Sequence, residues 1–359
     1  MNIAADTAEV LVETRGRLGL ITLNRPKALN ALSGSMIELI EPALAAWAKD
    51  EGIDAVLIRG AGGKAFCAGG DVRAIATGGN SPEMRRLKAG YFAAEYRLNY
   101  HIHTFGKPFI AVIDGITMGG GCGLSLHGSH VVATERTMLA MPETVLGLFP
   151  DVGATWFLNQ LMGEMGVYLG LSGVRLRADD LAALGLAQHI VPSDRIEALI
   201  DALASGPLDT PAIDAVLARH AVPVGNPVVA PRQAEIDTLF AGATVEAIAE
   251  TLAGASQDWA QEALATIRRA SPTSLEITLH QLRQGRALGP DVAAMLRIEY
   301  RLAVRSVGGS DFPEGVRAIL VDKDNKPVWQ PARLDQVDAA RIAQFFAPFE
   351  NPADELAFF

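Results

Sequence analysis

The chain has 359 residues, 49% of them hydrophobic and 20% charged, which allows one large folded domain or two smaller ones and excludes a mainly disordered protein. Lys and Arg total 31 against 41 for Asp and Glu. The resulting net charge of -10, without a cluster of basic residues, repels polyanions and argues against a nucleic-acid partner.

The cysteines and the N-terminal residues bear on the cellular compartment. Cys67 and Cys122 are the 2 cysteines, and both lie in glycine-rich stretches without the spacing of a disulfide framework or a zinc site, as is usual in a reducing compartment. Met1–Val10 has acidic residues and no basic segment followed by an apolar run, and no segment reaches about 18 uninterrupted apolar residues. We therefore expect a cytoplasmic protein with no membrane partner.

Short apolar runs alternate with helical periodicity in the first part of the chain, as in proteins built from β-β-α or βαβ units. The apolar runs predict strands at Val10–Glu13, Leu18–Leu23, Ala55–Arg59 and Pro108–Ile113. The periodicity predicts helices that continue to Lys49, with Ser33 as the N-cap, and over Met84–Tyr100. The fold class predicted from this alternation is α/β.

The composition changes near Ser205–Pro207, where a Pro-rich stretch leads into alanine-rich segments. We place a domain boundary there, which divides the chain into residues 1–205 and 206–359. The second part is expected to be mostly helical, with helices at Val245–Ala253 and Trp259–Arg269 and another that begins at Ser271-Pro272.

Two glycine-rich stretches, Lys64–Asp71 and Gly115–Gly123, each follow a predicted strand. Glycine lets the backbone approach a ligand closely, and the unpaired N–H groups at a helix start attract an oxygen anion. A tight turn and a close helix contact are the alternative explanations. Gly119–Leu126 does not satisfy G-x-G-x-x-G, and Lys64 is not in a P-loop, so dinucleotide and nucleotide-triphosphate sites lose their main support.

Glu143 and Asp151 lie in Met141–Gly153, a largely apolar segment interrupted by glycine and proline. Burial in such surroundings would raise the pKa of either carboxyl group, as is common at functional sites. A solvated carboxylate, or an Asp151 that caps a helix, is the alternative.

Four motifs in this order and spacing make the chain resemble the crotonase (enoyl-CoA hydratase/isomerase) superfamily: Asn24–Leu32, Ala68–Asp71, the glycine triplet Gly119–Gly121, and Pro142-Glu143. The resemblance implies a spiral of β-β-α units, with residues 1–205 as the CoA-thioester-binding catalytic core. It also implies an oxyanion hole made by the N–H groups of Gly70 and Gly120, with Ala68 and Asp71 in the same substrate-binding loop.

Within the superfamily, the chain looks most like the 3-hydroxyisobutyryl-CoA hydrolases. Hydratases usually carry a glutamate where this chain has Gly123, and glycine where it has Asp151. The hydrolase-like residues are Glu95-Tyr96, His127-Gly128 and Phe149–Gly153, and in the C-terminal half Ser271–Leu275, Ile298–Leu302 and Asp311–Ala318, with the resemblance continuing to Trp329.

The resemblance implies hydrolysis of a short branched 3-hydroxyacyl-CoA, as in valine catabolism. Glu143 would be the nucleophile or the general base, Asp151 would bind the substrate hydroxyl or orient Glu143, and Glu95 would contact the substrate. Arg25 and Lys27 would lie near the CoA phosphates, with plain solvated charges as the alternative. The reaction needs no cofactor beyond the CoA of the substrate and no metal.

Other assignments stay open at this point. An enoyl-CoA hydratase or isomerase is disfavoured by Gly123, and a non-catalytic acyl-CoA binding protein would have no need of both carboxylates. The cysteine beside the glycine triplet lacks a visible His/Asp relay, and the four histidines expected to be structural are His101, His103, His127 and His130. Superfamily members often form trimers or hexamers, which makes a homo-oligomer an option, although the longer C-terminal half could cover the surfaces involved.

Overall fold

A computed structural model describes residues 8–79 and 81–358. Two compact units make up the chain, and each is built from several segments. The sheet unit comprises the residues up to 70, together with 98–139 and 175–231, and the helical unit comprises 71–97, 140–174 and the residues from 232 onward. The division expected from composition, into residues 1–205 and 206–359, consists of two continuous ranges, whereas each of these units combines several segments. The expected division stays a prediction.

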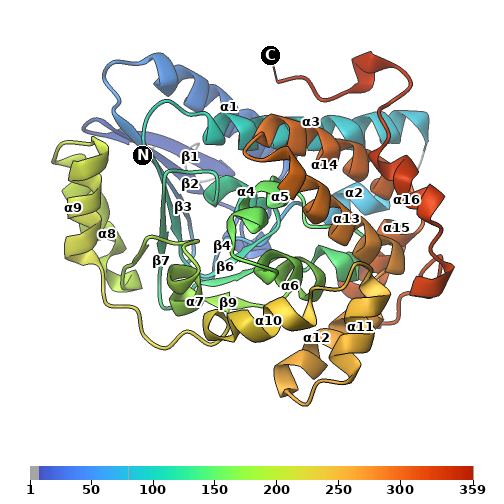
Figure 1. Cartoon of the computed structure of the whole chain (residues 1–359). Coiled ribbons are helices and arrows are strands. Elements are labelled where there is room, and N and C mark those ends of the chain that lie inside the picture. Colours follow the sequence, from blue (N-terminus) through green and yellow to red (C-terminus); the bar gives the residue numbers. More distant parts are fainter. Residues whose placement is uncertain (1–7, 80, 359) are drawn as a thin grey trace. The chain divides into compact units, whose positions relative to one another are not determined.

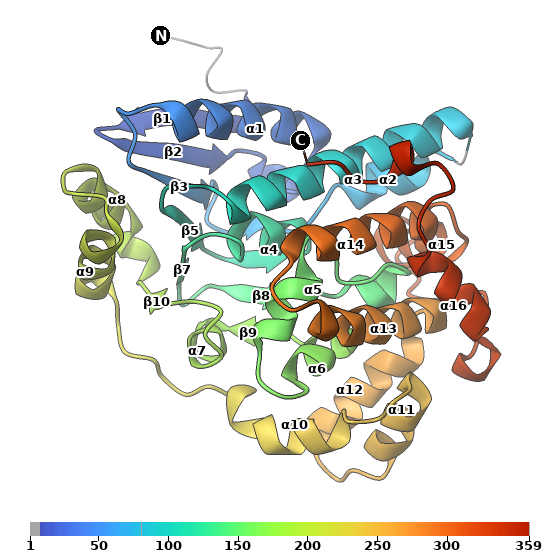
Figure 2. The same ribbon diagram turned by 45° about the horizontal axis from the view of Figure 1, so that its top comes forward.

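The sheet unit contains a six-stranded sheet in the order β1-β2-β3-β5-β7-β10 (Figures 1 and 2). β1 is antiparallel to β2, and the remaining neighbours are parallel. The strands are β1 (Val10–Arg15), β2 (Leu18–Leu23), β3 (Ala55–Gly60), β5 (Phe109–Ile113), β7 (His130–Ala133) and β10 (His189–Ile190). β2 is buried along its whole length, as expected for an apolar run inside a mostly parallel sheet.

Helices cover this sheet with amphipathic faces. α1 (Gly34–Lys49) begins where the Ser33 hydroxyl accepts a hydrogen bond from the Met36 N–H at 3.2 Å, so the predicted N-cap is confirmed. α8 (Ile196–Ala204) and α9 (Thr210–His220) contribute to a single core with strand residues such as Leu20 and Leu57. This core fixes the strands whose carboxyl ends lead into the glycine-rich loops.

A second sheet of the same unit has the order β4-β6-β8-β9. Its strands are β4 (Ala65–Cys67), β6 (Ile116–Met118), β8 (Met138–Ala140) and β9 (Leu176–Arg177), followed or flanked by α4 (Gly120–Ser125) and α7 (Ala178–Ala183). β4 and β6 are parallel neighbours, with Ala65 opposite Ile116. Because the carboxyl ends of parallel neighbours lie at one edge, the two glycine-rich stretches that follow them emerge together.

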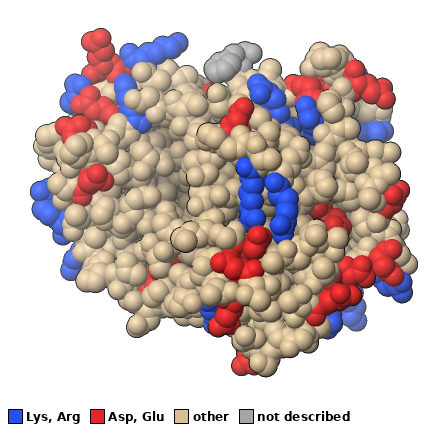
Figure 3. Space-filling model, viewed as in Figure 1, with Lys and Arg blue, Asp and Glu red and all other residues tan. Residues whose placement is uncertain are grey.

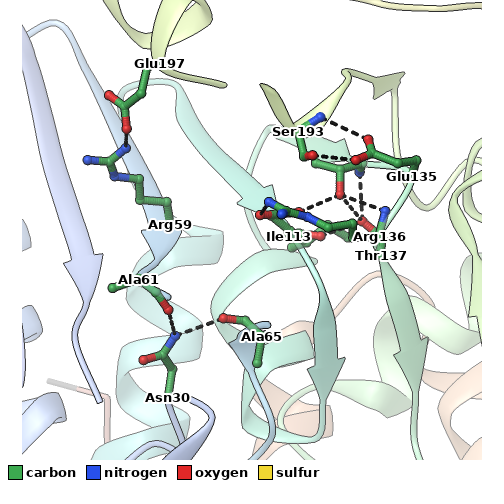
Figure 4. Close-up of polar contacts among 12 residues, drawn as sticks. Asn30, Arg59, Ala61, Ala65, Ile113, Glu135, Arg136, Thr137, Ser193 and Glu197 are labelled. Carbon is green, nitrogen blue, oxygen red and sulfur yellow. Dashed lines mark hydrogen bonds and ion pairs between the residues drawn. The ribbon is translucent and has the colours of Figure 1, made fainter. Parts of the chain in front are cut away.

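Polar side chains tie the connections of the sheet unit to its strands (Figure 4). The Asn30 side-chain amide donates to the carbonyls of Ala61 and Ala65, at 3.0 and 2.9 Å. Arg59 of β3 pairs with Glu197 of α8. Asn30 therefore anchors the connection from β3 to β4, which gives this residue of the Asn24–Leu32 motif a structural role.

The helical unit is made of helices and short turns packed on one another. Figure 2 shows α13, α14 and α16 side by side, and all three pairs of these helices are in contact. The main helices of this unit are α2 (Val72–Thr77), α5 (Ala154–Phe157), α6 (Met165–Ser172), α10 (Gln233–Leu239), α11 (Val245–Ala253), α12 (Asp258–Arg269), α13 (Pro272–Leu288), α14 (Val292–Val307), α15 (Asp311–Val316) and α16 (Ala339–Phe346).

Short turns complete the chain, and α3 (Pro82–His103) contributes residues to both units. These turns are η1 (Pro26–Ala28), η2 (Glu143–Leu146), η3 (Leu158–Gln160), η4 (Ser193–Arg195), η5 (Ala230–Arg232), a π-helical turn η6 (Arg317–Val321), η7 (Leu334–Gln336) and η8 (Pro352–Asp354). α13 begins at Ser271, whose hydroxyl accepts from the Ser274 N–H, so the predicted start of this helix is confirmed.

The observed elements confirm the predicted α/β class and the mostly helical C-terminal part. Across the described parts of the chain, no helix combines the length and apolar character required to span a membrane. The N-terminal prediction rests largely on residues 1–7, which lie outside the described residues. On the face shown in Figure 3, basic and acidic side chains are interspersed, and neither sign forms a continuous field there.

Candidate active site

The two glycine-rich loops of the sheet unit lie directly against each other. A Cβ atom on Gly121 would be 2.4 Å from the Cys67 carbonyl oxygen, and one on Gly69 would be 3.5 Å from the Met118 carbonyl oxygen. Gly69 also has a φ of 110°, a conformation that side chains other than glycine rarely adopt. Close backbone approach therefore explains the glycines at these positions.

Gly70 and Gly120 present backbone donors from these loops. Among the described residues, neither N–H donates a hydrogen bond to another group. The Leu32 N–H donates to the Gly69 carbonyl at 2.8 Å, so the first loop is fixed by its neighbours while its Gly70 donor is left available. Two preorganised N–H groups of this kind can stabilise the oxyanion of a thioester carbonyl.

The helical unit brings three buried carboxyl groups together. Glu95 on α3, Glu143 at the start of η2 and Asp151 before α5 are 2%, 6% and 5% exposed. The charges of Glu95 and Asp151 both act on the Glu143 carboxyl group and raise its pKa. We call Glu95, Glu143 and Asp151 the carboxylate cluster.

Burial is the main cause of the pKa shifts in the carboxylate cluster, and like charge adds to it. Burial raises the pKa of Glu143 well above its usual value, and the charges of Asp151 and Glu95 raise it further. Burial raises the pKa of Asp151 to about 6, against the opposing effect of a hydrogen bond from Tyr96. Burial and the charge of Asp151 also raise the pKa of Glu95 well above its usual value.

The hydrogen bonds of the carboxylate cluster are unequal. The Tyr96 hydroxyl donates to Asp151 Oδ2 at 2.7 Å, and Glu95 has a hydrogen bond with Tyr91. Oε2 of Glu143 is buried and has no hydrogen-bond partner in the described part of the chain. Glu143 therefore has a buried acceptor oxygen that a reacting group could use.

Asp151 does not cap the helix that follows it. The N-cap of α5 is Gly153, and the Asp151 side chain bonds instead to Tyr96. Glu299 accepts from Gly153 N at 2.6 Å and from Thr155 N at 2.8 Å, and the Ala154 N–H between them donates to the backbone carbonyl of Asp151 at 2.9 Å. The helix-cap alternative for Asp151 is therefore wrong.

The residues expected near CoA have different surroundings. The Arg25 guanidinium lies 3.0 Å from Glu9 Oε1 and donates to the Ala31 carbonyl at 2.6 Å, which gives it a structural function in the first loop. Lys27 is exposed on η1. The Ala68 N–H donates to the Leu29 carbonyl at 3.1 Å.

Asp71 precedes α2, at the point where the chain passes from the sheet unit to the helical unit. It is half-buried and occupies the N-cap position of α2, without a side-chain capping bond.

The histidines and Cys122 have structural surroundings. His101 Nδ1 lies 2.8 Å from Glu41 Oε1, the rings of His103 and His127 meet edge to face, and His130 bonds to Ser129. Cys122 is fully buried in α4. No group of three or more histidine, cysteine or acidic side chains in the described ranges could hold a metal ion.

Three buried residues of the helical unit contact the Asp151 turn, and the sequence did not predict these contacts. Tyr96 and Glu299 occur in segments that carried the family resemblance, but nothing local marks them as partners of the Asp151 turn, and Gln281 has no such signal. Gln281 donates to the Pro150 carbonyl at 2.6 Å. Their partners lie 55 to 146 positions away along the chain, so only the folded structure reveals them.

Comparison with known proteins identifies the class. The model of the enoyl-CoA hydratase/isomerase family matches residues 18–346. The chain therefore belongs to this family, the crotonase family, as the motifs indicated.

Within the family, the chain is similar over its length to proteins named 3-hydroxyisobutyryl-CoA hydrolase, mitochondrial. The protein from Danio rerio is 44% identical over 96% of this chain and 91% of its own length. The proteins from Xenopus laevis and Homo sapiens are 46% and 43% identical, each over 94% of this chain and 88% of their own length. The predicted resemblance to this subfamily is confirmed.

Two solved structures share the fold over nearly the whole chain. A carnitinyl-CoA dehydratase from Mycobacterium thermoresistibile has a TM-score of 0.90 and 38% identity, covering 98% of this chain and 99% of its own. An enoyl-CoA hydratase from Rhodobacter sphaeroides has a TM-score of 0.88 and 38% identity, covering 98% and 100%.

The expectation of a cytoplasmic protein is contradicted, because the hydrolases similar to this chain are named as mitochondrial. Cysteine usage distinguishes oxidising from reducing compartments and does not separate one reducing compartment from another. The two cysteines therefore indicate a reducing compartment without specifying the cytoplasm.

Proposed function

We propose that this protein hydrolyses 3-hydroxyisobutyryl-CoA to the free acid and CoA, the activity in the names of its relatives. The observation that carries the proposal is the carboxylate cluster, in which Glu143 has a buried oxygen without a partner among the described residues. Such a group can attack a thioester or take a proton from water. The reaction fits a place in valine catabolism.

In this mechanism, the N–H groups of Gly70 and Gly120 receive the negative charge that develops on the thioester oxygen. Losing one donor of this kind typically costs about 3 to 4 kcal/mol of transition-state stabilisation. As a nucleophile, Glu143 forms a bond to the carbonyl carbon, the C–S bond breaks, and CoA leaves as a thiolate that gains a proton. Water then hydrolyses the acyl-enzyme anhydride and restores Glu143.

As a general base, Glu143 instead takes a proton from the attacking water, whose oxygen bonds to the carbonyl carbon before the C–S bond breaks. Asp151 would accept a hydrogen bond from the 3-hydroxyl group through the oxygen that Tyr96 does not bind, or orient Glu143. Glu95 is proposed as a substrate contact. Arg25, Lys27, Ala68 and Asp71 are proposed for the CoA side, with Lys27 the better candidate for a phosphate because Arg25 already pairs with Glu9.

Hydration of an enoyl-CoA is the second candidate, and two observations favour it. The solved structures at 38% identity are titled as a dehydratase and a hydratase. Glu143 is also not an isolated carboxylate, since Glu95 and Asp151 both influence it. Against hydration, the position that carries a glutamate in typical hydratases is Gly123, a buried glycine of α4.

A substrate panel distinguishes the two reactions. Purified protein would be given 3-hydroxyisobutyryl-CoA and crotonyl-CoA, with free thiol measured by a colorimetric reagent and the double bond by its ultraviolet absorbance. We expect thiol release from the first substrate and little loss of enoyl absorbance from the second. Rapid hydration without thiol release would overturn the hydrolase proposal, and binding without either reaction would indicate an acyl-CoA binding protein.

The absence of a cofactor requirement and a homo-oligomeric state both stay predictions. Thiol release should be unchanged after dialysis against a chelator and without added nucleotide. Light scattering during size-exclusion chromatography would measure the mass against the 38.0 kDa of one chain.

A further inference from the structure

Two buried side chains from the C-terminal helices hold the turn that carries Asp151, one on each side of it. On the N-terminal side, Gln281 of α13 donates from Nε2 to the Pro150 carbonyl at 2.6 Å. On the C-terminal side, Glu299 of α14 accepts from Gly153 N at 2.6 Å and from Thr155 at both N (2.8 Å) and Oγ1 (2.6 Å). Gln281 and Glu299 are both 0% exposed, so water does not compete for these bonds.

The turn needs such support because its backbone is unusual. Val152 has a φ of 55° and Gly153 a φ of 89°, and the left-handed region is unfavourable for a β-branched residue such as valine. α5 is short and its first N–H groups have no partner within the helix. Without Glu299, two of these donors would be buried and unsatisfied, and the turn would relax to another conformation.

The geometry points to Gln281 and Glu299 as positioning residues that fix Asp151 for recognition of the 3-hydroxyl group of the substrate. This inference rests on the proposed function, in which Asp151 binds that hydroxyl. Tyr96 fixes the carboxylate itself through Oδ2, and the two C-terminal residues fix the backbone on which it stands. The C-terminal helices α13 and α14 thereby determine substrate selectivity, although neither residue touches the substrate.

Figures 1 and 2 both show α13 and α14 beside α5, in agreement with the contacts between these helices. α14 carries Glu299 on its buried face, together with Met295 and Leu302. The two bonds from Thr155 and the bond from Gly153 use both oxygens of Glu299. An amide in the same place would offer one acceptor oxygen and one N–H₂ group, so one of the backbone donors would face another donor.

A double-mutant cycle tests the inference. The measured quantity is the selectivity, defined as kcat/KM for 3-hydroxyisobutyryl-CoA divided by kcat/KM for isobutyryl-CoA, which lacks the hydroxyl. Asp151→Asn should lower the selectivity by about tenfold or more, the scale of a hydrogen bond to a charged group. Glu299→Gln should produce a similar loss, and adding it to Asp151→Asn should change the selectivity by less than about twofold, because it acts through Asp151.

Thr278→Val provides a matched control. Thr278 is 0% exposed on α13, about one turn before Gln281, and its hydroxyl bonds to the Ser274 carbonyl within the helix. This variant should leave the selectivity unchanged. Gln281→Met and Thr155→Val are milder variants that remove one hydrogen bond each, and each should lower the selectivity several-fold. They replace Glu299→Gln in the test if that variant does not fold.

The outcomes separate the inference from the function on which it rests. If Asp151→Asn keeps the selectivity of the parent enzyme, the proposed role of Asp151 is wrong. If Asp151→Asn loses selectivity while folded Glu299→Gln, or both milder variants, keep it, the positioning role is wrong. A purely structural role is shown if Glu299→Gln lowers kcat/KM equally for both substrates, or if its effect adds fully to that of Asp151→Asn.

Discussion

Glu143 combines two properties that rarely occur together in a carboxylate, namely burial and an oxygen without a hydrogen-bond partner. It is 6% exposed, and its Oε2 has no hydrogen-bond partner in the described part of the protein. Most buried carboxylates are satisfied by donors, as Glu299 is by Thr155 and Gly153. Removal from water makes the Glu143 carboxylate more reactive toward an electrophile, and it also favours the protonated form.

Replacement of Glu143 by Gln should lower kcat for 3-hydroxyisobutyryl-CoA by at least about 10²-fold. The side chain keeps its size and loses the ability to attack or to accept a proton, whether the carboxylate is nucleophile or base. Binding of the substrate, measured by calorimetry with the inactive variant, should change little. Folded Glu143→Gln with the kcat of the parent enzyme would contradict both roles.

The charge of Asp151 should determine the pH at which activity is lost on acidification. Both proposed roles of Glu143 require its ionised form, so activity should fall as pH decreases through the pKa of Glu143, which burial and the neighbouring charges raise above 4.5. Asp151→Asn removes one of those charges, lowers the pKa of Glu143 and moves the acid limb of kcat/KM to lower pH. The residual activity of this variant, followed from pH 4 to 8, checks the direction.

A shift of that limb to higher pH would contradict the electrostatic coupling. The conservative change Tyr96→Phe serves as the comparison, because it removes the hydrogen bond that lowers the pKa of Asp151 without removing its charge. Tyr96→Phe should therefore raise the pKa of Asp151, whereas Asp151→Asn abolishes that titration.

At the level of elements, the pairing of β4 with β6 explains how two glycine-rich stretches far apart in the sequence lie side by side. The strands leave the sheet at one edge, and the absence of side chains lets the following loops come into backbone contact. The proposed donor at Gly120 should therefore depend on the close packing of Gly121 beside it as well as on its own N–H.

Gly120→Pro should lower the rate of thiol release by about 10²- to 10³-fold, the loss typical of an oxyanion hole, because it removes one of the two proposed donors. Gly121→Ala keeps both donors but places a Cβ 2.4 Å from the Cys67 carbonyl oxygen, so it should separate the loops and lower both kcat and thermal stability. Circular dichroism checks that each variant folds. Near-normal kcat in folded Gly120→Pro would exclude that donor.

The sequence predicted the elements of the first part of the chain well. The strands agree with β1, β2, β3 and β5 within two residues, and the helix predicted at 84–100 is α3, observed at 82–103. These predictions depend on local periodicity and capping, which act within a few residues. The motif residues at the two glycine loops were likewise visible in the sequence.

The contacts that position Asp151 were not predictable in the same way. Tyr96 lies 55 positions before Asp151, and Glu299 lies 146 positions after Gly153. A buried glutamate on an amphipathic helix gives no local sign of the partner that it will meet. Charge patterns predict that such a residue is exposed, and tertiary packing overrides that expectation.

On the scale of the whole molecule, burial makes the ionised form of several carboxyl groups costly to stability. Glu95, Glu143, Asp151 and Glu299 all lie in the helical unit, and burial raises the pKa of each. The buried faces of α13 and α14 in the same unit include apolar residues such as Leu279 and Leu296.

The stability of the protein should consequently fall as pH rises from about 5 to 8. Each of these acids holds its proton more tightly in the folded state than in the unfolded state. Its stabilising contribution is therefore fully present below the unfolded pKa and is lost as pH rises through the folded pKa, which is about 6 for Asp151 and about 8 for Glu299. Each unit of raised pKa corresponds to about 1.4 kcal/mol, so the loss should reach a few kcal/mol.

Glu299→Gln cannot ionise and should flatten this dependence, even though it lowers stability at every pH by leaving a backbone donor unsatisfied. Glu38→Gln, on the exposed side of α1, should leave the slope unchanged. Thermal or urea unfolding at pH 5, 6.5 and 8 measures the three slopes, and a parent protein that becomes more stable toward pH 8 would show that these acids are ionised at little cost in the folded state.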